Sequence, residues 1–178
     1  ISNALVQALS SGAFVLLMLL TAFGYLLLSR EQLQRELERL ETTDTLTDVP
    51  NRRGFFNLLA PWMALARRPG LPTAVVLIDL DQFKRINDSY GHPAGDTVLR
   101  AMVETCRGQL RDSDLLGRMA GVEFALLLPR TDLLDALLVS DRIRRAIEAT
   151  PVKTERAVIK MTASFGVTTI RADDSTVS

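Results

Sequence analysis

The sequence has very few residues that could build a disulfide framework or a zinc site. Its 178 residues include one cysteine, Cys106, and one histidine, His92. A lone cysteine excludes internal disulfides, and one residue of each type cannot form a Cys/His zinc site. Any metal would therefore be a hard cation held by carboxylates. The 21 basic and 21 acidic residues give no net charge, which argues against a general nucleic-acid-binding protein.

Charge is also absent from the first 29 residues, which contain no Asp, Glu, Lys or Arg. More than 20 uncharged residues span about 30 Å as a helix, enough to cross a bilayer. A buried core helix and a signal peptide are the alternatives. A signal peptide begins with basic residues, but here Arg30, Arg35 and Arg39 follow the apolar run. We therefore predict a transmembrane helix over residues 1–29, with the rest of the chain in the cytoplasm.

The start of the chain and its single thiol add two expectations. The first residue is Ile rather than Met, so we expect a fragment or a processed form with a sensory region upstream. A lone cysteine fits a reducing compartment.

Residues 30–43, REQLQRELERLETT, favour a helix. Leu26, Leu33 and Leu40 lie seven residues apart, with Leu37 at an intermediate d-like position. The segment is either a solvated helical spacer or a short parallel coiled coil that holds two copies together. Two heptads are too few to decide, and we favour the coiled coil and hence a homodimer.

The remaining residues, 44–178, alternate between predicted helices and predicted strands. This alternation predicts an α/β or α+β sandwich, with helices packed on a sheet. The expected helices cover 51–66, 82–87, 93–110 and 131–149, and the expected strands cover 73–80, 114–119, 123–129 and 158–170.

Acidic residues end the first of these strands. The apolar run 73–80 finishes in Asp79-Leu80-Asp81, which places carboxylates at the sheet edge. Mg²⁺ needs one or two carboxylates when phosphates and water complete its shell. In the alternative, Asp81 caps the next helix and binds no ligand.

The residues that follow suggest a nucleotide. Lys84 supplies a charge suited to phosphate. Asn87 and Asp96 can together match a guanine edge, because a carboxylate accepts from the ring and exocyclic N–H groups. Gly91 and Gly95 would allow tight backbone turns between them.

The stretch 79–96 contains the pattern D-x-D-x-F-K-x-x-N-D followed by G-H-x-x-G-D, and residues 44–52 read DTLTDVPNR. On these motifs residues 44–178 resemble a GGDEF domain, the diguanylate cyclase family of bacteria. Asp48 stands where that family usually has Gly. The resemblance implies condensation of two GTP into cyclic di-GMP and pyrophosphate by a dimer with facing sites. Together with the predicted transmembrane helix, it implies a bacterial inner-membrane location.

The resemblance further implies a fold like nucleotide cyclase and polymerase palm domains, a central five-stranded sheet with surrounding helices. It implies roles for single residues. Asp79, the Leu80 carbonyl and Glu123 would hold Mg²⁺ or Mn²⁺. The remaining roles are guanine recognition by Asn87 and Asp96, proximity of Phe83 and Lys84 to the phosphates, and substrate contact at Gly121.

The signature hairpin departs from the family pattern Gly-Gly-Asp/Glu-Glu-Phe, since it reads Ala120-Gly121-Val122-Glu123-Phe124. Ala120 is tolerable if its φ is negative. Val122 replaces an acid that the family uses in metal binding and catalysis. Losing even an outer partner of a metal costs about 10–100-fold, so we expect impaired catalysis with Glu123 as the remaining catalytic acid. Valine also simply suits a strand.

Two further features bear on regulation. Arg111 and Asp114 form R-x-x-D five residues before the hairpin signature, which in the family is an inhibitory site for cyclic di-GMP; a charged turn is the alternative. The family also continues past the last strand into a helix with phosphate-binding Lys and Arg, whereas this chain stops at Ser178. That helix is either absent or truncated.

Three hypotheses follow. The favoured one is a membrane-anchored regulator that binds GTP or cyclic di-GMP with an impaired active site. The second is a working diguanylate cyclase that tolerates Val122. The third is a ligand-free dimerisation module, which we disfavour because the guanine and metal positions are all present.

Overall fold

The computed structural model describes residues 3–40, 42–66, 71–154 and 157–170. The chain divides into two compact units, residues 1–41 and residues 42–178. Each unit is considered by itself.

The N-terminal unit is one helix, α1 (Asn3–Leu40). Its segment Ser11–Arg30 is long and apolar enough to cross a membrane, with a mean hydropathy of 2.1 and none of it buried. Length and composition alone make it a candidate span. The side chains of residues 31–40 and all of Glu41 lie outside the described part, so the coiled coil stays a prediction.

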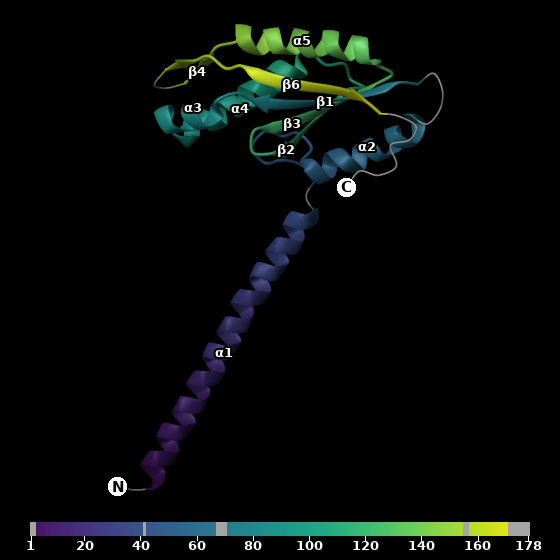
Figure 1. The fold of residues 1–178 in the computed structure, drawn as a ribbon. Coiled ribbons are helices and arrows are strands. Elements are labelled where there is room, and N and C mark those ends of the chain that lie inside the picture. Colours follow the sequence, from purple (N-terminus) through teal and green to yellow (C-terminus); the bar gives the residue numbers. More distant parts are fainter. Residues whose placement is uncertain (1–2, 41, 67–70, 155–156, 171–178) are drawn as a thin grey trace. The chain divides into compact units, whose positions relative to one another are not determined.

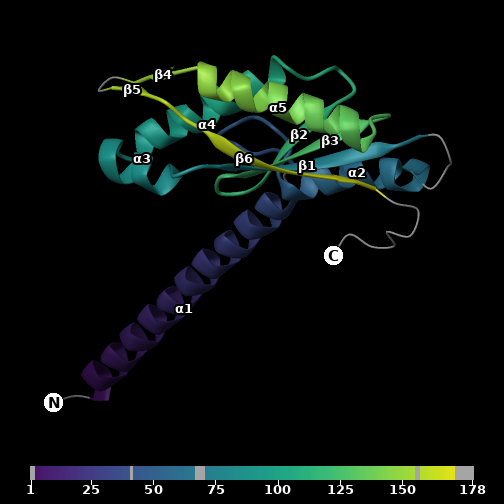
Figure 2. The same cartoon turned by 45° about the horizontal axis from the view of Figure 1, so that its top comes forward.

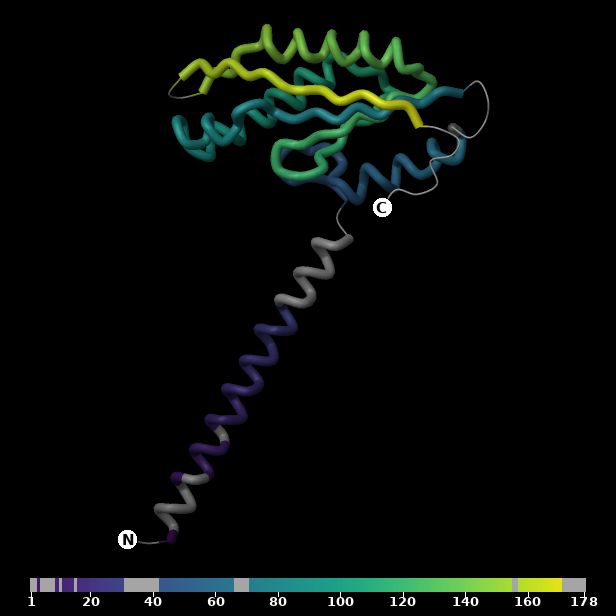
Figure 3. Tube along the Cα trace, viewed as in Figure 1, coloured from purple at the N-terminus to yellow at the C-terminus, as the bar shows by residue number. Residues whose placement is uncertain are grey.

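The C-terminal unit is built on an antiparallel sheet with strand order β2-β3-β1-β6 (Figure 1). Its strands are β1 (Thr73–Leu80), β2 (Leu115–Ala120), β3 (Glu123–Pro129) and β6 (Ala163–Thr169). The apolar strand β1 lies between β3 and β6, and Figure 3 traces it beside β6. Both flanking strands reach the end of β1, where Asp79 pairs with Glu123 on one side and Ser164 on the other.

Helices cover the two faces of this sheet unequally. The helices α4 (His92–Arg107) and α5 (Leu133–Ala149) share the main core with one face, whereas α2 (Arg52–Ala66) packs on the other. Figure 2 shows α5 and α2 on opposite sides of the strands. The short helix α3 (Phe83–Tyr90) connects β1 to α4.

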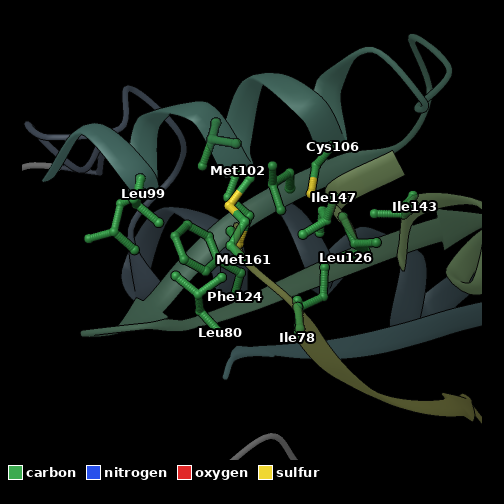
Figure 4. Close-up of a cluster of buried hydrophobic side chains, with 14 of the residues drawn as sticks. Ile78, Leu80, Leu99, Met102, Cys106, Phe124, Leu126, Ile143, Ile147 and Met161 are labelled. Atoms are coloured by element: carbon green, nitrogen blue, oxygen red, sulfur yellow. The ribbon is translucent and has the colours of Figure 1, made fainter. Parts of the chain in front are cut away.

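Alternation along the strands separates the two hydrophobic clusters. Ile78, Leu80, Phe124 and Leu126 point into the main core with Met102 of α4 and Ile143 of α5 (Figure 4). Ala125 and Leu127 face the opposite way and pack with Phe55 and Leu59 of α2. Odd-numbered residues of β1 and β3 therefore belong to the α2 face, which decides where the acidic residues lie.

The structure confirms the predicted helices and the hairpin but corrects the long strand 158–170. The chain there forms β5 (Val158–Ile159), which pairs with β4 (Val152–Lys153), and then β6, which pairs with β1. Alternate burial continues from Ile159 through Met161 to Ala163. Periodicity reports which side chains are buried and does not report the strand partner, so one pattern covered two strands. Among the described residues the central sheet has four strands, not the expected five.

Candidate functional site

Two carboxylates lie side by side at the end of the central strand. Asp79 of β1 and Glu123 of β3 are directly opposite in the register, and both are exposed. Alternation places both on the α2 face. The Leu80 amide donates to the Val122 carbonyl at 3.4 Å, which ties the end of β1 to the hairpin turn.

Asp81 forms hydrogen bonds with the segment at the start of β6 and does not cap the next helix. Its carboxylate accepts hydrogen bonds from Thr162 Oγ1 at 2.8 Å and from Ser164 Oγ at 2.7 Å. The N-cap of α3 is instead Gln82, with φ 55° and no side-chain cap. Both oxygens of Asp81 thus fasten β1 to the start of β6, and the N-cap interpretation is wrong.

The donor chemistry of this edge fits one hard cation better than two. Asp79, Glu123 and the Leu80 carbonyl supply oxygens of the kind Mg²⁺ and Mn²⁺ accept, and Mg²⁺ uses one or two carboxylates when phosphates complete its shell. In the part of the chain that the structure describes, no three His, Cys, Asp or Glu residues gather as a metal site.

Val122 takes part in packing. Its side chain is half-buried and packs against the main core. Gly121 has φ +38°, which suits glycine. Ala120 is not among the described residues with positive φ, so the methyl group at this position is tolerated as predicted.

The side chain of Arg118 forms hydrogen bonds with the hairpin turn, a role that the sequence did not predict. Its Nε and Nη2 donate to the Gly121 carbonyl at 2.9 and 2.7 Å, and its guanidinium lies 5.9 Å from the Phe124 ring centre. Its Nη1 donates to both carboxylate oxygens of Asp44, at 2.9 and 3.1 Å. A single arginine in the apolar run LLGRMAGVEF was the available signal.

The carboxylate of Asp44, which pairs with Arg118, is itself held by further hydrogen bonds. Besides Arg118, it accepts hydrogen bonds from the Thr47 amide at 2.9 Å and the Thr47 hydroxyl at 2.5 Å. Burial raises the pKa of Asp44, but the hydrogen bonds from Thr47 and Arg118 outweigh burial and hold the pKa below its ordinary value. The turn that follows Glu41 is thereby joined to the signature hairpin.

The predicted guanine-reading residues Asn87 and Asp96 lie on the consecutive helices α3 and α4. A Cβ added to Gly95 would lie 2.0 Å from Asn87 Oδ1 and 2.9 Å from the end of the Phe83 ring. Asn87 Oδ1 is the one buried side-chain polar atom without a hydrogen-bond partner among the described residues. Asp96 follows Gly95 directly and is half-buried. The Asn87 oxygen is therefore a hydrogen-bond acceptor that lacks a donor.

The two glycines of this segment act differently. Gly91 has φ +85° and its amide donates to the Asn87 carbonyl at 2.8 Å, so the predicted turn is confirmed there. Gly95 lies inside α4 and makes no turn. Its missing side chain makes room for Asn87 and Phe83, a requirement of close approach that local sequence does not reveal. Phe83 also packs against the main core, whereas Lys84 is exposed.

The R-x-x-D segment lines a cavity of about 280 Å³ between α4 and β2. The Arg111 amide donates to Asp114 Oδ2 at 2.9 Å, and the Asp114 amide donates to the Arg111 carbonyl at 3.0 Å. This turn leaves the Arg111 side chain exposed. Arg107, which the motif did not include, lines the same cavity and donates to the Asp48 carbonyl.

Asp48 shows how the chain accommodates the loss of a glycine. It has φ +53°, a conformation that aspartate adopts more readily than most residues. The substitution for the family's Gly is therefore compatible with the same turn.

The fold is an α+β domain with two acids paired at one edge of its antiparallel sheet, and comparison with known proteins identifies the family. Residues 41–178 match the family model described as diguanylate cyclase, GGDEF domain. This chain belongs to the GGDEF family. Diguanylate cyclase DgcP of Pseudomonas aeruginosa is 37% identical over 133 residues, which are 75% of this chain and 20% of that protein. The chain spans between a fifth and a third of the length of the curated relatives it matches first.

Solved structures agree. Diguanylate cyclase SiaD of P. aeruginosa, solved with its activator SiaC, has a TM-score of 0.72 and 32% identity, covering 97% of this chain and 68% of SiaD. The GGDEF domain of DgcB from Caulobacter crescentus, solved with cyclic di-GMP, has a TM-score of 0.71 and 28% identity. It covers 75% of this chain and 80% of that domain.

Proposed function

We propose that this GGDEF domain is a membrane-anchored regulator in cyclic di-GMP signalling that binds nucleotide but catalyses weakly or not at all. The observation that carries the proposal is Val122. An aliphatic side chain packed on the main core occupies the position of the family's metal-binding acid. It supplies no lone pair, and Glu123 is the only acid left in the signature.

GTP recognition is supported by the unpaired acceptor of Asn87. Guanine presents N1–H and N2–H donors on one edge, and Asn87 Oδ1 and the Asp96 carboxylate are acceptors for such an edge. A base bound there would supply the missing partner of a buried oxygen, which otherwise costs about 1–3 kcal/mol.

Asp79 and Glu123 would hold a Mg²⁺ or Mn²⁺ ion that arrives with the triphosphate. The cation supplies neutralisation of phosphate charge when bound. The chain's own contribution is to place two carboxylates on neighbouring strands and the positive charge of Lys84 on α3. One pair of acids favours binding of a single metal–nucleotide complex over the two-cation chemistry of phosphoryl transfer.

Cyclic di-GMP binding is supported by the cavity beside Arg111. Guanidinium groups of Arg107 and Arg111 can donate to phosphate or guanine oxygens, and Asp114 can accept from guanine. The DgcB domain was solved in complex with cyclic di-GMP.

The remaining parts of the proposal concern location and assembly. Residues 1–29 would span the inner membrane, residues 30–43 would pair as a coiled coil, and residues 44–178 would lie in the cytoplasm as a homodimer. The exposed apolar segment of α1 supports the anchor.

An active diguanylate cyclase is the second candidate. It is favoured by the direct pairing of Asp79 with Glu123 and by relatives that are named diguanylate cyclases. A ligand-free dimerisation module has less support, because it leaves the Asn87 oxygen unexplained.

Incubation of the full-length protein with GTP and Mg²⁺ separates these candidates. We expect little cyclic di-GMP from the wild type and at least tenfold more from Val122→Asp. Val122→Asn, which has the shape of Asp without its charge, is the matched control and should stay inactive. Strong wild-type turnover would establish the active cyclase instead.

Calorimetric titration with cyclic di-GMP tests the second site. We expect binding to the wild type and at least a tenfold loss in Arg111→Ala, with Arg130→Ala, an exposed arginine outside the cavity lining, as control. Equal binding by wild type and Arg111→Ala removes the inhibitory site from the proposal.

A further inference from the structure

Asp81, the residue that follows β1, is joined to the start of β6 by three hydrogen bonds. Its amide donates to the Thr162 carbonyl at 2.9 Å, and its carboxylate accepts from Thr162 Oγ1 at 2.8 Å and from Ser164 Oγ at 2.7 Å. The two hydroxyl bonds have a charged acceptor, which makes them stronger than hydrogen bonds between neutral groups. Together they connect segments that lie 81 and 83 residues apart in the sequence.

The same end of β1 is joined less closely to the hairpin on its other side. There the Leu80 amide donates to the Val122 carbonyl at 3.4 Å, which is beyond the usual range of about 2.7–3.2 Å. Directly after Asp81 the chain leaves the sheet, because Gln82 has φ 55° and α3 begins at Phe83. The hydrogen bonds of Asp81 therefore hold the chain at the point where it leaves the sheet.

The candidate cation ligands on β1 are the two residues before Asp81. In an antiparallel ladder the amide and the carbonyl of one residue point toward the same neighbouring strand. Leu80 donates to Val122, so its carbonyl is also directed toward the hairpin, where Glu123 begins β3. A shift of Asp81 would therefore move the Asp79 carboxylate and the Leu80 carbonyl relative to Glu123. We call Asp79, the Leu80 carbonyl and Glu123 the cation edge.

Asp81 itself does not join these ligands. Both of its carboxylate oxygens accept hydrogen bonds from hydroxyl groups. Among the residues that the structure describes, no three His, Cys, Asp or Glu gather as a metal site, so Asp81 does not complete a set with Asp79 and Glu123. Groups that orient metal ligands without binding the metal commonly change its affinity by about 10–100-fold.

We propose that Asp81 is a positioning residue for the cation edge. The inference rests on the proposed function, which places a Mg²⁺ or Mn²⁺ ion there together with the nucleotide. Asp81 acts through Thr162 and Ser164, because these hydroxyls hold the end of β1 against β6 and so fix the separation of the ligands. Guanine recognition should depend on Asp81 less, because α3, which carries Asn87, packs against α4.

Calorimetric titration of the full chain in mild detergent tests the proposal. The ligand is 3′-deoxy-GTP, which lacks the hydroxyl needed to form cyclic di-GMP. Its affinity is measured once with Mn²⁺ and once with EDTA, and the ratio of the two affinities is the contribution of the cation. A general loss of structure lowers both affinities and leaves this ratio unchanged, whereas a displaced cation ligand lowers the ratio.

We expect the ratio to fall at least tenfold in Asp81→Ala. It should also fall in Ser164→Ala, although that substitution removes no carboxylate. Asp81→Asn keeps one acceptor oxygen and gains an N–H donor that the other hydroxyl can accept, so its ratio should stay within about threefold of the wild type. Thr168→Ala is the control, because it removes an exposed hydroxyl from the other end of β6, opposite Val75.

An unchanged ratio in Asp81→Ala overturns the positioning role. Equal falls in Asp81→Ala and Asp81→Asn with no fall in Ser164→Ala also overturn it, because Asp81 would then bind the cation itself. If Mn²⁺ does not raise the affinity of the wild type, the cation part of the proposed function fails and this inference fails with it. The wild-type measurement therefore distinguishes a failure of the proposed function from a failure of the inference alone.

Discussion

At the scale of single residues, the signature hairpin combines a loss and a gain. Val122 stands where the family pattern has an acid, and its side chain packs against the main core. Arg118 holds the turn in place through Gly121 and Asp44. These hydrogen bonds hold the hairpin turn independently of the residue at position 122, so placing an acid there in Val122→Asp is an informative experiment.

The ion pair between Asp44 and Arg118 predicts that the stability of the folded protein depends on pH. The pKa of Asp44 is lower in the folded protein than in the unfolded chain, so its contribution is present above about pH 4 and is lost as the pH falls through the folded pKa. We expect Asp44→Asn to lower the free energy of unfolding by about 1–2 kcal/mol at pH 7. The difference should shrink below pH 4, as measured by urea unfolding.

Asp141→Asn is the control for that experiment, because Asp141 also pairs with arginines but on the exposed side of α5. Exposed pairs contribute little, so its effect should be much smaller at every pH. An equal effect of the two substitutions would show that the Asp44–Arg118 pair contributes no more to stability than an exposed ion pair.

The close approach of Asn87 to Gly95 predicts that a side chain at position 95 weakens nucleotide binding. In Gly95→Ala the new methyl group would meet Asn87 Oδ1 at 2.0 Å and displace that side chain. We expect GTP affinity, measured by calorimetry, to fall at least tenfold, the equivalent of about 1.4 kcal/mol. Gly108→Ala is the control, since its Cβ would meet nothing closer than 3.6 Å. Unchanged GTP binding in Gly95→Ala would contradict the guanine assignment.

At the scale of elements, the contact between α2 and β2 depends on a missing side chain. A Cβ at Gly117 would lie 2.6 Å from Phe55 Cδ2, and Phe55 is fully buried. We expect Gly117→Ala to destabilise the domain by about 1–3 kcal/mol through overpacking. Gly166→Ala on β6 is the matched strand control, because its Cβ would meet nothing within 4 Å.

Urea unfolding of the two variants measures this difference. A change within about 0.5 kcal/mol is expected for an unstrained surface site, and Gly166→Ala should stay in that range. Similar values for both variants would mean that α2 can move away from the sheet at little cost.

At the scale of the whole molecule, the two compact units predict separable properties. Residues 42–178 hold both hydrophobic clusters, so a fragment of these residues should unfold cooperatively without detergent. The full chain should partition into the detergent phase of a two-phase extraction because of residues 11–30. Recovery of the full chain in the aqueous phase would contradict the anchor.

The sequence by itself determined the family and most elements, and it supplied the candidate nucleotide-binding residues. These features depend on local patterns, such as the apolar run of β1 ending in Asp79 and the motif from Phe83 to Asp96. Chemical type and spacing along the chain are sufficient to recognise them.

Only the tertiary structure decided which groups meet. Asp81 forms hydrogen bonds with Thr162 and with Ser164 of β6, and Arg118 pairs with Asp44, which lies 74 residues away in the sequence. The last predicted strand is divided into β5, which pairs with β4, and β6, which pairs with β1. The structure also showed that Gly95 makes room for Asn87 and that α5 leaves four leucines uncovered. Each of these depends on contacts between segments distant in sequence, and local patterns carry no information about such distances.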